Sequence, residues 1–196
     1  MNPYHYTVFS QNPGYRAFGR QADKRIRGIM VVRKDNPINS LKDLSGSTIA
    51  FPAPAAFAAS VLQRAKLSND KIPFSAKYVS SHDSVYRSVA KGLFPAGGGI
   101  QRTLGNVAPE IRAQLKILWT TDGFTPHAFA VHPNVAKDVG DKIAAAFIDL
   151  SASAEGKALL KAINFKAIQS AANEDWDDVR ALGIDLLTNL IKSPGK

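Results

Sequence analysis

Short apolar segments alternate along the chain with segments of helical periodicity, and this alternation is the strongest constraint on the fold. Segments rich in β-branched and aromatic residues lie at 25–34, 48–51, 76–79, 116–120 and 128–131. Between them, apolar residues recur near a 3.6-residue period in 56–67 and 84–93. Strands and helices that alternate at this spacing predict α/β units with largely parallel sheets.

The C-terminal part of the chain has a different pattern. Helices are expected at 138–150, 154–163 and 173–191, with no convincing strand among them. No internal repeat is visible, and low complexity is limited to 53–59 and 97–99. A chain of 196 residues accommodates either one domain of ordinary size or two small lobes.

Composition excludes several classes of protein. Apolar residues make up 45% and charged residues 21% of the chain, as in soluble globular proteins. The absence of cysteine excludes disulfides, thiolate metal sites and cysteine nucleophiles. No apolar run reaches the length of a membrane span, and Met1–Tyr6 lacks the basic and apolar regions of an export signal. From the sequence as written we therefore expect neither an export signal nor a membrane anchor.

The formal net charge of +9 is unevenly distributed. Residues 1–35 contain seven basic and two acidic residues, whereas 135–196 contain eight basic and nine acidic ones, four of them within 174–178. A basic segment with interspersed aromatic residues can bind nucleic acid. However, no nucleic-acid-binding motif is present and the basic residues form no helical stripe, so a solvated face is favoured and no nucleic-acid partner is expected.

Two junctions where a predicted strand runs into a predicted helix could hold an anion. In 51–60, a helix start would present unpaired N–H groups and the positive end of its dipole, and the small alanine side chains would let a ligand approach the backbone. Many such turns, however, bind nothing. The glycines and lysine of phosphate-binding loops are missing. In 80–84, Asp83 or Ser84 can cap the helix, which leaves His82 either for an anion or for a structural pair with Asp83.

A hydrolytic site is a weaker interpretation of the same residues. Asp83, Ser84 and His132 could suggest a triad, with Ser60 as another candidate nucleophile, but no Gly-x-Ser-x-Gly motif is present. No histidine pair has the spacing of a zinc helix. We therefore expect no catalytic residue, no metal site and no cofactor.

Five segments in order carry a resemblance to a known family. They are 28–35, 37–44, 46–51, 81–85 and 115–120. Together they resemble the periplasmic phosphate/phosphite/phosphonate-binding proteins of ABC transporters, from Asn2 to about Leu187. The resemblance implies a type II periplasmic-binding-protein-like α/β fold, in which two crossing strands join two lobes and a ligand is held in the cleft.

The resemblance also implies the division of the chain and its ligand-binding residues. Residues 36–121 would form one complete α/β lobe, lobe two, while 1–35 and 122–196 would form an incomplete lobe one with hinge strands and C-terminal helices. The implied ligand-binding residues are Tyr4, Tyr6, Ala56, Phe57, Ala58, Ser81, His82 and His127.

The implied site departs from the family pattern at two places. Ala56–Phe57–Ala58 stands where the family has a Ser-Thr-Ser type run, so the hydroxyl donors are replaced and the backbone N–H groups remain. His127 stands where phosphonate binders can carry an aspartate that meets a ligand ammonium group. This substitution favours a plain oxyanion over an aminophosphonate.

The function implied is that of a non-enzymatic substrate-binding component of an ABC importer for phosphate, phosphite or phosphonate. Its partners would be the oxyanion and the membrane subunits of the transporter. The alternative is a truncated sensor or interaction module that kept the fold and no longer transports. The family implies a periplasmic location, whereas a chain that truly starts at Met1 would stay in the cytoplasm.

The chain begins inside the family pattern, so we expect it to lack an N-terminal part of lobe one. In that case strands 25–34 and 128–131 would present unpaired edges, and the C-terminal helices would expose apolar faces. We expect a homodimer or higher oligomer to cover them.

Overall fold

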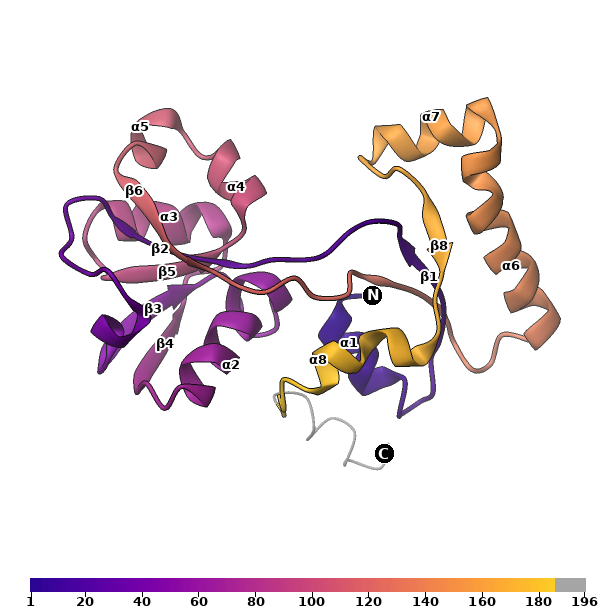
Figure 1. Cartoon of the computed structure of the whole chain (residues 1–196), viewed down its shortest axis with the longest axis horizontal. Helices are drawn as coiled ribbons and strands as arrows, with labels where there is room; N and C mark the ends of the chain where they lie inside the picture. Colours follow the sequence, from indigo (N-terminus) through magenta and orange to yellow (C-terminus); the bar gives the residue numbers. More distant parts are fainter. Residues whose placement is uncertain (186–196) are drawn as a thin grey trace. The chain divides into compact units, whose positions relative to one another are not determined.

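The computed structural model describes residues 1–185 as two compact units (Figure 1). Unit 1 consists of Met1–Ile26 and the described residues from Phe124 onward, and unit 2 of Arg27–Gly123. The sequence-based boundaries after residues 35 and 121 differ from this division. In the structure the first boundary follows Ile26, nine residues before the predicted one, because strand β2 (Ile29–Arg33) pairs inside the sheet of unit 2.

Unit 2 contains a five-stranded mixed sheet in the order β4-β3-β5-β2-β6. Its other strands are β3 (Ser47–Phe51), β4 (Phe74–Tyr78), β5 (Ala96–Gly99) and β6 (Leu115–Thr120). Strand β3 is parallel to β4 and β5, whereas β2 is antiparallel to β5 and β6. The expectation of largely parallel sheets is therefore wrong in part, because β2 enters this sheet from the opposite end.

Helices cover both faces of this sheet, and strand β2 shows the consequence in its sequence. Its residues Ile29 and Val31 pack with Val85 and Val89 on one face, and Met30 and Val32 pack with Ile49, Phe51 and Leu67 on the other. A strand buried on both faces is apolar at every position rather than at alternate ones. The helical segments of unit 2 are η1 (Leu41–Leu44), η2 (Phe57–Val61), α2 (Leu62–Asn69), α3 (His82–Ala90), α4 (Gln101–Asn106) and α5 (Pro109–Arg112).

Strand β5 was not predicted, because Gly97–Gly98–Gly99 reads as low complexity. The structure explains the glycines by close packing on both sides. A Cβ atom on Gly97 would lie 2.4 Å from Val85 Cγ1, and one on Gly98 would lie 2.2 Å from the carbonyl oxygen of Ala59. Glycine at these positions lets helical segments approach the central strand from both faces.

Unit 1 contains an antiparallel sheet in the order β7-β1-β8, formed by β1 (Arg16–Gln21), β7 (Ala128–Val131) and β8 (Ile168–Ser170). Strand β8 contradicts the expectation that the C-terminal part holds no strand. It is only three residues long and takes its stability from pairing with β1, which no local pattern reveals.

The helices of unit 1 are α1 (Pro3–Phe9), α6 (Lys137–Asp149), η3 (Leu150–Ala152), α7 (Ala154–Ala162), η4 (Asn173–Trp176) and α8 (Asp177–Arg180). The predicted helices 138–150 and 154–163 are confirmed as α6 and α7. The predicted helix 173–191 starts as expected but is broken into η4 and α8, which ends at Arg180; its last residues, 186–191, lie outside the described part.

The predicted unpaired strand edges are only partly present. Strand β2 pairs with a neighbour on each side, so the expectation of an open edge there is wrong. Strand β7 pairs with β1 on one side and has no second partner strand among residues 1–185. None of the helices in this described part is both long and apolar enough to cross a bilayer.

Candidate functional site

Three strand-to-helix junctions of unit 2 lie at one edge of its sheet. Strand β3 leads to η2, β4 leads to α3, and β5 leads to α4. Because β3 is parallel to both β4 and β5, the three helical segments begin at the carboxyl ends of adjacent strands. Ligands of open α/β sheets commonly bind at this edge. The expected residues Ala56, Phe57, Ala58, Ser81 and His82 all lie at these junctions.

The helix expected at Ala56 is present, but its first turn is a π-helix. The N–H group of Val61 donates to the carbonyl oxygen of Ala56 at 3.1 Å, and Ala56 caps the segment without a side-chain hydrogen bond. The N–H groups of a first helical turn have no acceptor within the helix. The backbone at 58–59 can therefore donate to an anion, and the methyl side chains leave room for it to approach.

A buried glutamine holds this turn in place. Gln63 is fully buried, and its Nε2 donates to the carbonyl oxygens of Ala58 at 2.7 Å and of Ile29 at 3.0 Å. Gly28 permits this approach, because a Cβ atom there would lie 1.9 Å from the Ala58 oxygen. Gln63 was not predicted, and polarity alone does not single it out, because Arg64 and Lys66 lie in the same helical segment.

His82 belongs to a hydrogen-bonded chain that fixes its ring. Its Nδ1 lies 3.2 Å from Thr103 Oγ1, which in turn lies 2.7 Å from the hydroxyl of Tyr86. The Tyr86 hydroxyl accepts from the N–H of Ile100 at 3.1 Å. With Nδ1 engaged, Nε2 is the ring nitrogen left to contact a ligand. Ser81 has a structural role as well, because its Oγ accepts from the N–H of Ser84 and caps α3.

The electrostatic setting of His82 favours the neutral imidazole. Partial desolvation and the positive charge of Arg102 lower the pKa of His82. The alternative of a His82–Asp83 pair is not observed, since Asp83 accepts from Arg87 Nε at 2.6 Å. Of the triad considered from the sequence, Asp83 and Ser84 lie in unit 2, whereas His132 lies in unit 1, where its ring is against that of Tyr15 at a centroid distance of 5.0 Å.

The two tyrosines expected to line the site have internal roles in unit 1. Tyr6 is fully buried; its hydroxyl donates to Asn173 Oδ1 at 3.1 Å and accepts from the N–H of Ala17 at 3.2 Å. Tyr4 is 2% exposed, and its hydroxyl donates to the carbonyl oxygen of Ile184 at 3.4 Å. Both side chains therefore serve the packing of unit 1.

His127 also lies in unit 1, immediately before β7, and is exposed to solvent. Desolvation by nearby chain and the positive charge of the Met1 ammonium group lower the pKa of His127. Of the eight expected ligand residues, five are thus at one edge of unit 2 and three are in unit 1.

Two arginines of the basic N-terminal segment form ion pairs within unit 1. Arg20 lies 3.4 Å from Asp175, and Arg25 lies 2.8 Å from Asp178, so residues from opposite ends of the chain pair inside unit 1. Asp178 also accepts from the N–H of Thr125 at 2.9 Å. The charge asymmetry along the sequence is therefore partly balanced by ion pairs between N-terminal arginines and C-terminal aspartates.

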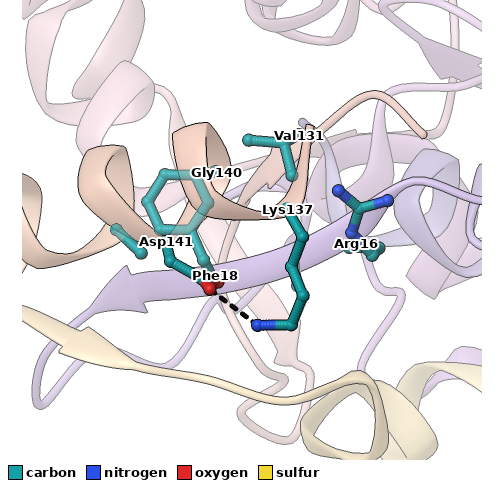
Figure 2. Close-up of a pocket in the computed structure, with 8 residues that line it drawn as sticks. Arg16, Phe18, Val131, Lys137, Gly140 and Asp141 are labelled. Carbon is teal, nitrogen blue, oxygen red and sulfur yellow. Dashed lines mark hydrogen bonds and ion pairs between the residues drawn. The ribbon is translucent and has the colours of Figure 1, made fainter. Parts of the chain in front are cut away.

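A cavity of about 350 Å³ lies within unit 1, between strands β1 and β7 and helix α6 (Figure 2). Its lining is largely apolar, with Phe18 and Val131 among the residues shown. The charged groups at its rim are engaged: Lys137 pairs with Asp141 at 2.6 Å, and Arg16 donates to the carbonyl oxygen of Val135 at 2.9 Å. This cavity contains none of the expected ligand residues and offers no convergent set of free donors.

In residues 1–185 no group of His, Asp and Glu side chains is arranged to hold a metal ion.

Comparison with known proteins assigns the family. The family described as ABC transporter, phosphonate, periplasmic substrate-binding protein matches residues 1–176. The chain belongs to this family. No curated protein matches the sequence. As the substrate-binding family of an ABC transporter, it comprises solute-binding components rather than enzymes.

Solved structures of this fold support the assignment. A Xanthomonas citri protein bound to chloride ion is 16% identical, with a TM-score of 0.80 over 93% of this chain and 73% of that one. The binding protein component of a Pseudomonas aeruginosa ABC phosphonate transporter is 17% identical, with a TM-score of 0.73 over 93% and 66%. PhnD1 from Prochlorococcus marinus, in complex with methylphosphonate, is 16% identical, with a TM-score of 0.71 over 93% and 82%. At these identities the similarity shows the type II periplasmic-binding fold. The chain spans just under two thirds of the Pseudomonas protein.

Proposed function

We propose that this family member binds a small phosphorus oxyanion, namely phosphate, phosphite or a phosphonate, at the junction edge of unit 2. The observation that carries the proposal is the placement of the η2 start and of His82 at the carboxyl ends of adjacent parallel strands. The methylphosphonate complex of PhnD1 supports this ligand class. In an importer, the ligand would then pass to the membrane subunits of the ABC transporter.

The proposed binding uses backbone donors and one titratable side chain. The N–H groups of residues 58–59 and the positive end of the helix would receive the oxyanion. His82 Nε2 would make a charge-assisted hydrogen bond once the ring is protonated. Because Ala56 and Ala58 carry no hydroxyl groups, backbone geometry rather than side-chain donors would select the ligand.

Calorimetric titration of the chain with phosphate, phosphite and methylphosphonate tests this proposal. We expect saturable binding of at least one anion, and we expect His82→Gln to weaken it by about tenfold or more, as for the loss of a hydrogen bond to a charged group. His132→Gln, which makes the same change in unit 1, should leave the affinity within about twofold. Equal effects of the two variants would contradict the assignment of His82.

The pH dependence of the same titration gives a second measurement. Desolvation and the charge of Arg102 lower the pKa of His82 in the free protein, whereas a bound anion favours the imidazolium ion. Binding should therefore take up a proton, and affinity should rise as the pH falls from 7.5 to 5.5. The anion itself also changes its protonation with pH, but this affects the wild-type chain and the His82→Gln variant equally. The ratio of the two affinities at each pH therefore reports the contribution of the His82 side chain. A ratio that does not change with pH would argue against this role.

The alternative function, a sensor or interaction module without transport, predicts no heat with any of the three anions. We do not favour it, because the junction edge retains the helix start and the anchored histidine. A hydrolase using Ser60 or Ser84 is not supported. Ser60 Oγ is buried, and Ser84 Oγ accepts from Ser81 Oγ at 2.9 Å.

We also retain self-association as a proposal, on the basis of an apolar surface on unit 1. Among the described residues of unit 1, five large apolar side chains are exposed, on helices α6 and α7 or just after α7: Val139, Ile143, Phe147, Leu159 and Ile163. On α6 they recur at every fourth residue, and the ion pair Asp138–Lys142 borders this row. Because the border carries both signs of charge, a second copy of the chain can meet it without net repulsion.

Light scattering coupled to gel filtration at micromolar concentration tests this association. We expect the mass of a dimer for the wild-type chain and that of a monomer for the double variant Ile143→Lys/Leu159→Lys. The matched control Lys91→Glu/Leu93→Lys alters an exposed apolar residue of unit 2 and should remain dimeric. A monomeric wild-type chain would refute the proposal.

A further inference from the structure

Arg102 occupies a distinctive place at the junction edge of unit 2. It is the second residue of α4, the helix that follows β5, and β5 is parallel to β3 next to it. Its neighbour Thr103 is the residue hydrogen-bonded to His82 at 3.2 Å. Arg102 therefore lies in the first turn of the third helical segment that starts at this edge, beside the proposed oxyanion site.

The charge of Arg102 is not compensated by the protein. Its side chain is exposed, and it makes no hydrogen bond or ion pair with any residue in the part of the chain that the structure describes. No acidic residue lies in the first turn of α4, and a cation at the start of a helix is opposed by the helix dipole. By contrast, Arg27, which precedes β2, donates to the carbonyl oxygen of Thr121 at 3.0 Å.

Only one of these three helix starts carries an acidic side chain in its first turn, and that side chain is already paired. Asp83, in the first turn of α3, is engaged by Arg87 at 2.6 Å. A ligand that reaches beyond the oxyanion site toward α4 would thus meet the guanidinium group of Arg102, and the first turns of the three helical segments present no unpaired carboxylate to it. This environment favours a second negative charge on the ligand and disfavours an ammonium group.

We propose that the site prefers phosphonates that carry a second anionic group, such as a carboxylate, and that Arg102 determines this preference. The inference rests on the proposed function, because it assigns the phosphonate group to the η2 start and His82. The planar guanidinium can hold a carboxylate through two parallel hydrogen bonds, whereas a lysine would present a single point charge. Methylphosphonate would use only the first part of such a site.

The test compares phosphonoacetate, methylphosphonate and 2-aminoethylphosphonate by calorimetry at one pH and ionic strength. We expect phosphonoacetate to bind about tenfold tighter than methylphosphonate, and 2-aminoethylphosphonate to bind weakest. Arg102→Met should remove most of the phosphonoacetate advantage while changing methylphosphonate affinity by less than about threefold. Arg102→Lys should restore only part of it. The control Lys91→Met removes the same charge at the opposite end of α3 and should preserve the advantage.

The outcomes separate this inference from the function on which it rests. If methylphosphonate binds as tightly as phosphonoacetate, or if Arg102→Met weakens both equally, the preference is refuted and the oxyanion site stands. Failure of phosphonoacetate to bind while methylphosphonate binds refutes the preference alone. Failure of all three ligands to bind refutes both.

Discussion

Replacement of Gly98 by alanine is expected to lower the free energy of unfolding of unit 2 by about 3 kcal/mol. The new Cβ atom would lie 2.2 Å from the carbonyl oxygen of Ala59 and 2.7 Å from Cδ1 of Phe51. Neither neighbour can move freely. The Ala59 carbonyl belongs to the π-helical turn η2, and Phe51 is fully buried. Either β5 or the η2 turn must shift, so the change should also weaken oxyanion binding.

Chemical denaturation followed by circular dichroism measures this effect, and Gly105→Ala is the matched control. Gly105 lies in helix α4, where an added Cβ atom meets nothing within 4 Å. Alanine is favoured over glycine in a helix by about 0.5–1 kcal/mol, so this variant should be neutral or slightly more stable. Comparable stabilities of the two variants would show that the close approach at Gly98 is not a constraint.

Replacement of Trp176 by alanine is expected to destabilise unit 1 by about 4 kcal/mol, within the range for large aromatic residues in a core. Trp176 is fully buried, its Nε1 donates to the carbonyl oxygen of Pro126 at 2.8 Å, and its ring lies 4.6 Å from that of Tyr6. The substitution opens a cavity beside Tyr6 and leaves a buried carbonyl without its donor. Thermal unfolding by circular dichroism would record the loss.

Trp176→Phe separates the two contributions. Phenylalanine keeps most of the ring packing but removes the donor to Pro126, so a loss of about 1–2 kcal/mol is expected. If Trp176→Ala unfolded no more easily than Trp176→Phe, the packing of Tyr6 against Trp176 would not be the basis of the unit 1 core.

The strands recognised from the sequence are those that pack against helices with their own side chains. The β-branched run around Met30–Val32 was identifiable because both of its faces are buried. Strand β5 was missed for the opposite reason, since its glycines contribute space rather than side chains. Strands β1 and β8 were missed because their stability comes from pairing between distant segments, such as Gly19 with Ser170.

The candidate site was predictable where it depends on local chemistry. The helix start after β3 and the histidine in the first turn of α3 are visible as residues at a strand-to-helix junction. Gln63 and the anchoring of His82 by Thr103 were not visible, because both depend on segments brought together by the sheet. The role of Tyr6 was ambiguous from the sequence, since an aromatic residue near the N-terminus can equally line a site or fill a core; in the structure its hydroxyl has partners within unit 1.

By itself, the sequence determined the α/β character, the order of most elements and the resemblance that the family match confirms. These properties follow from periodicity and from residues that are neighbours along the chain. Only the tertiary structure decided which unit β2 joins, why β5 is made of glycine, and that Arg20 and Arg25 are paired with Asp175 and Asp178. Each of these features depends on close approach between segments far apart in the sequence. Such features are stabilised by tertiary contacts and not by the conformational preferences of neighbouring residues.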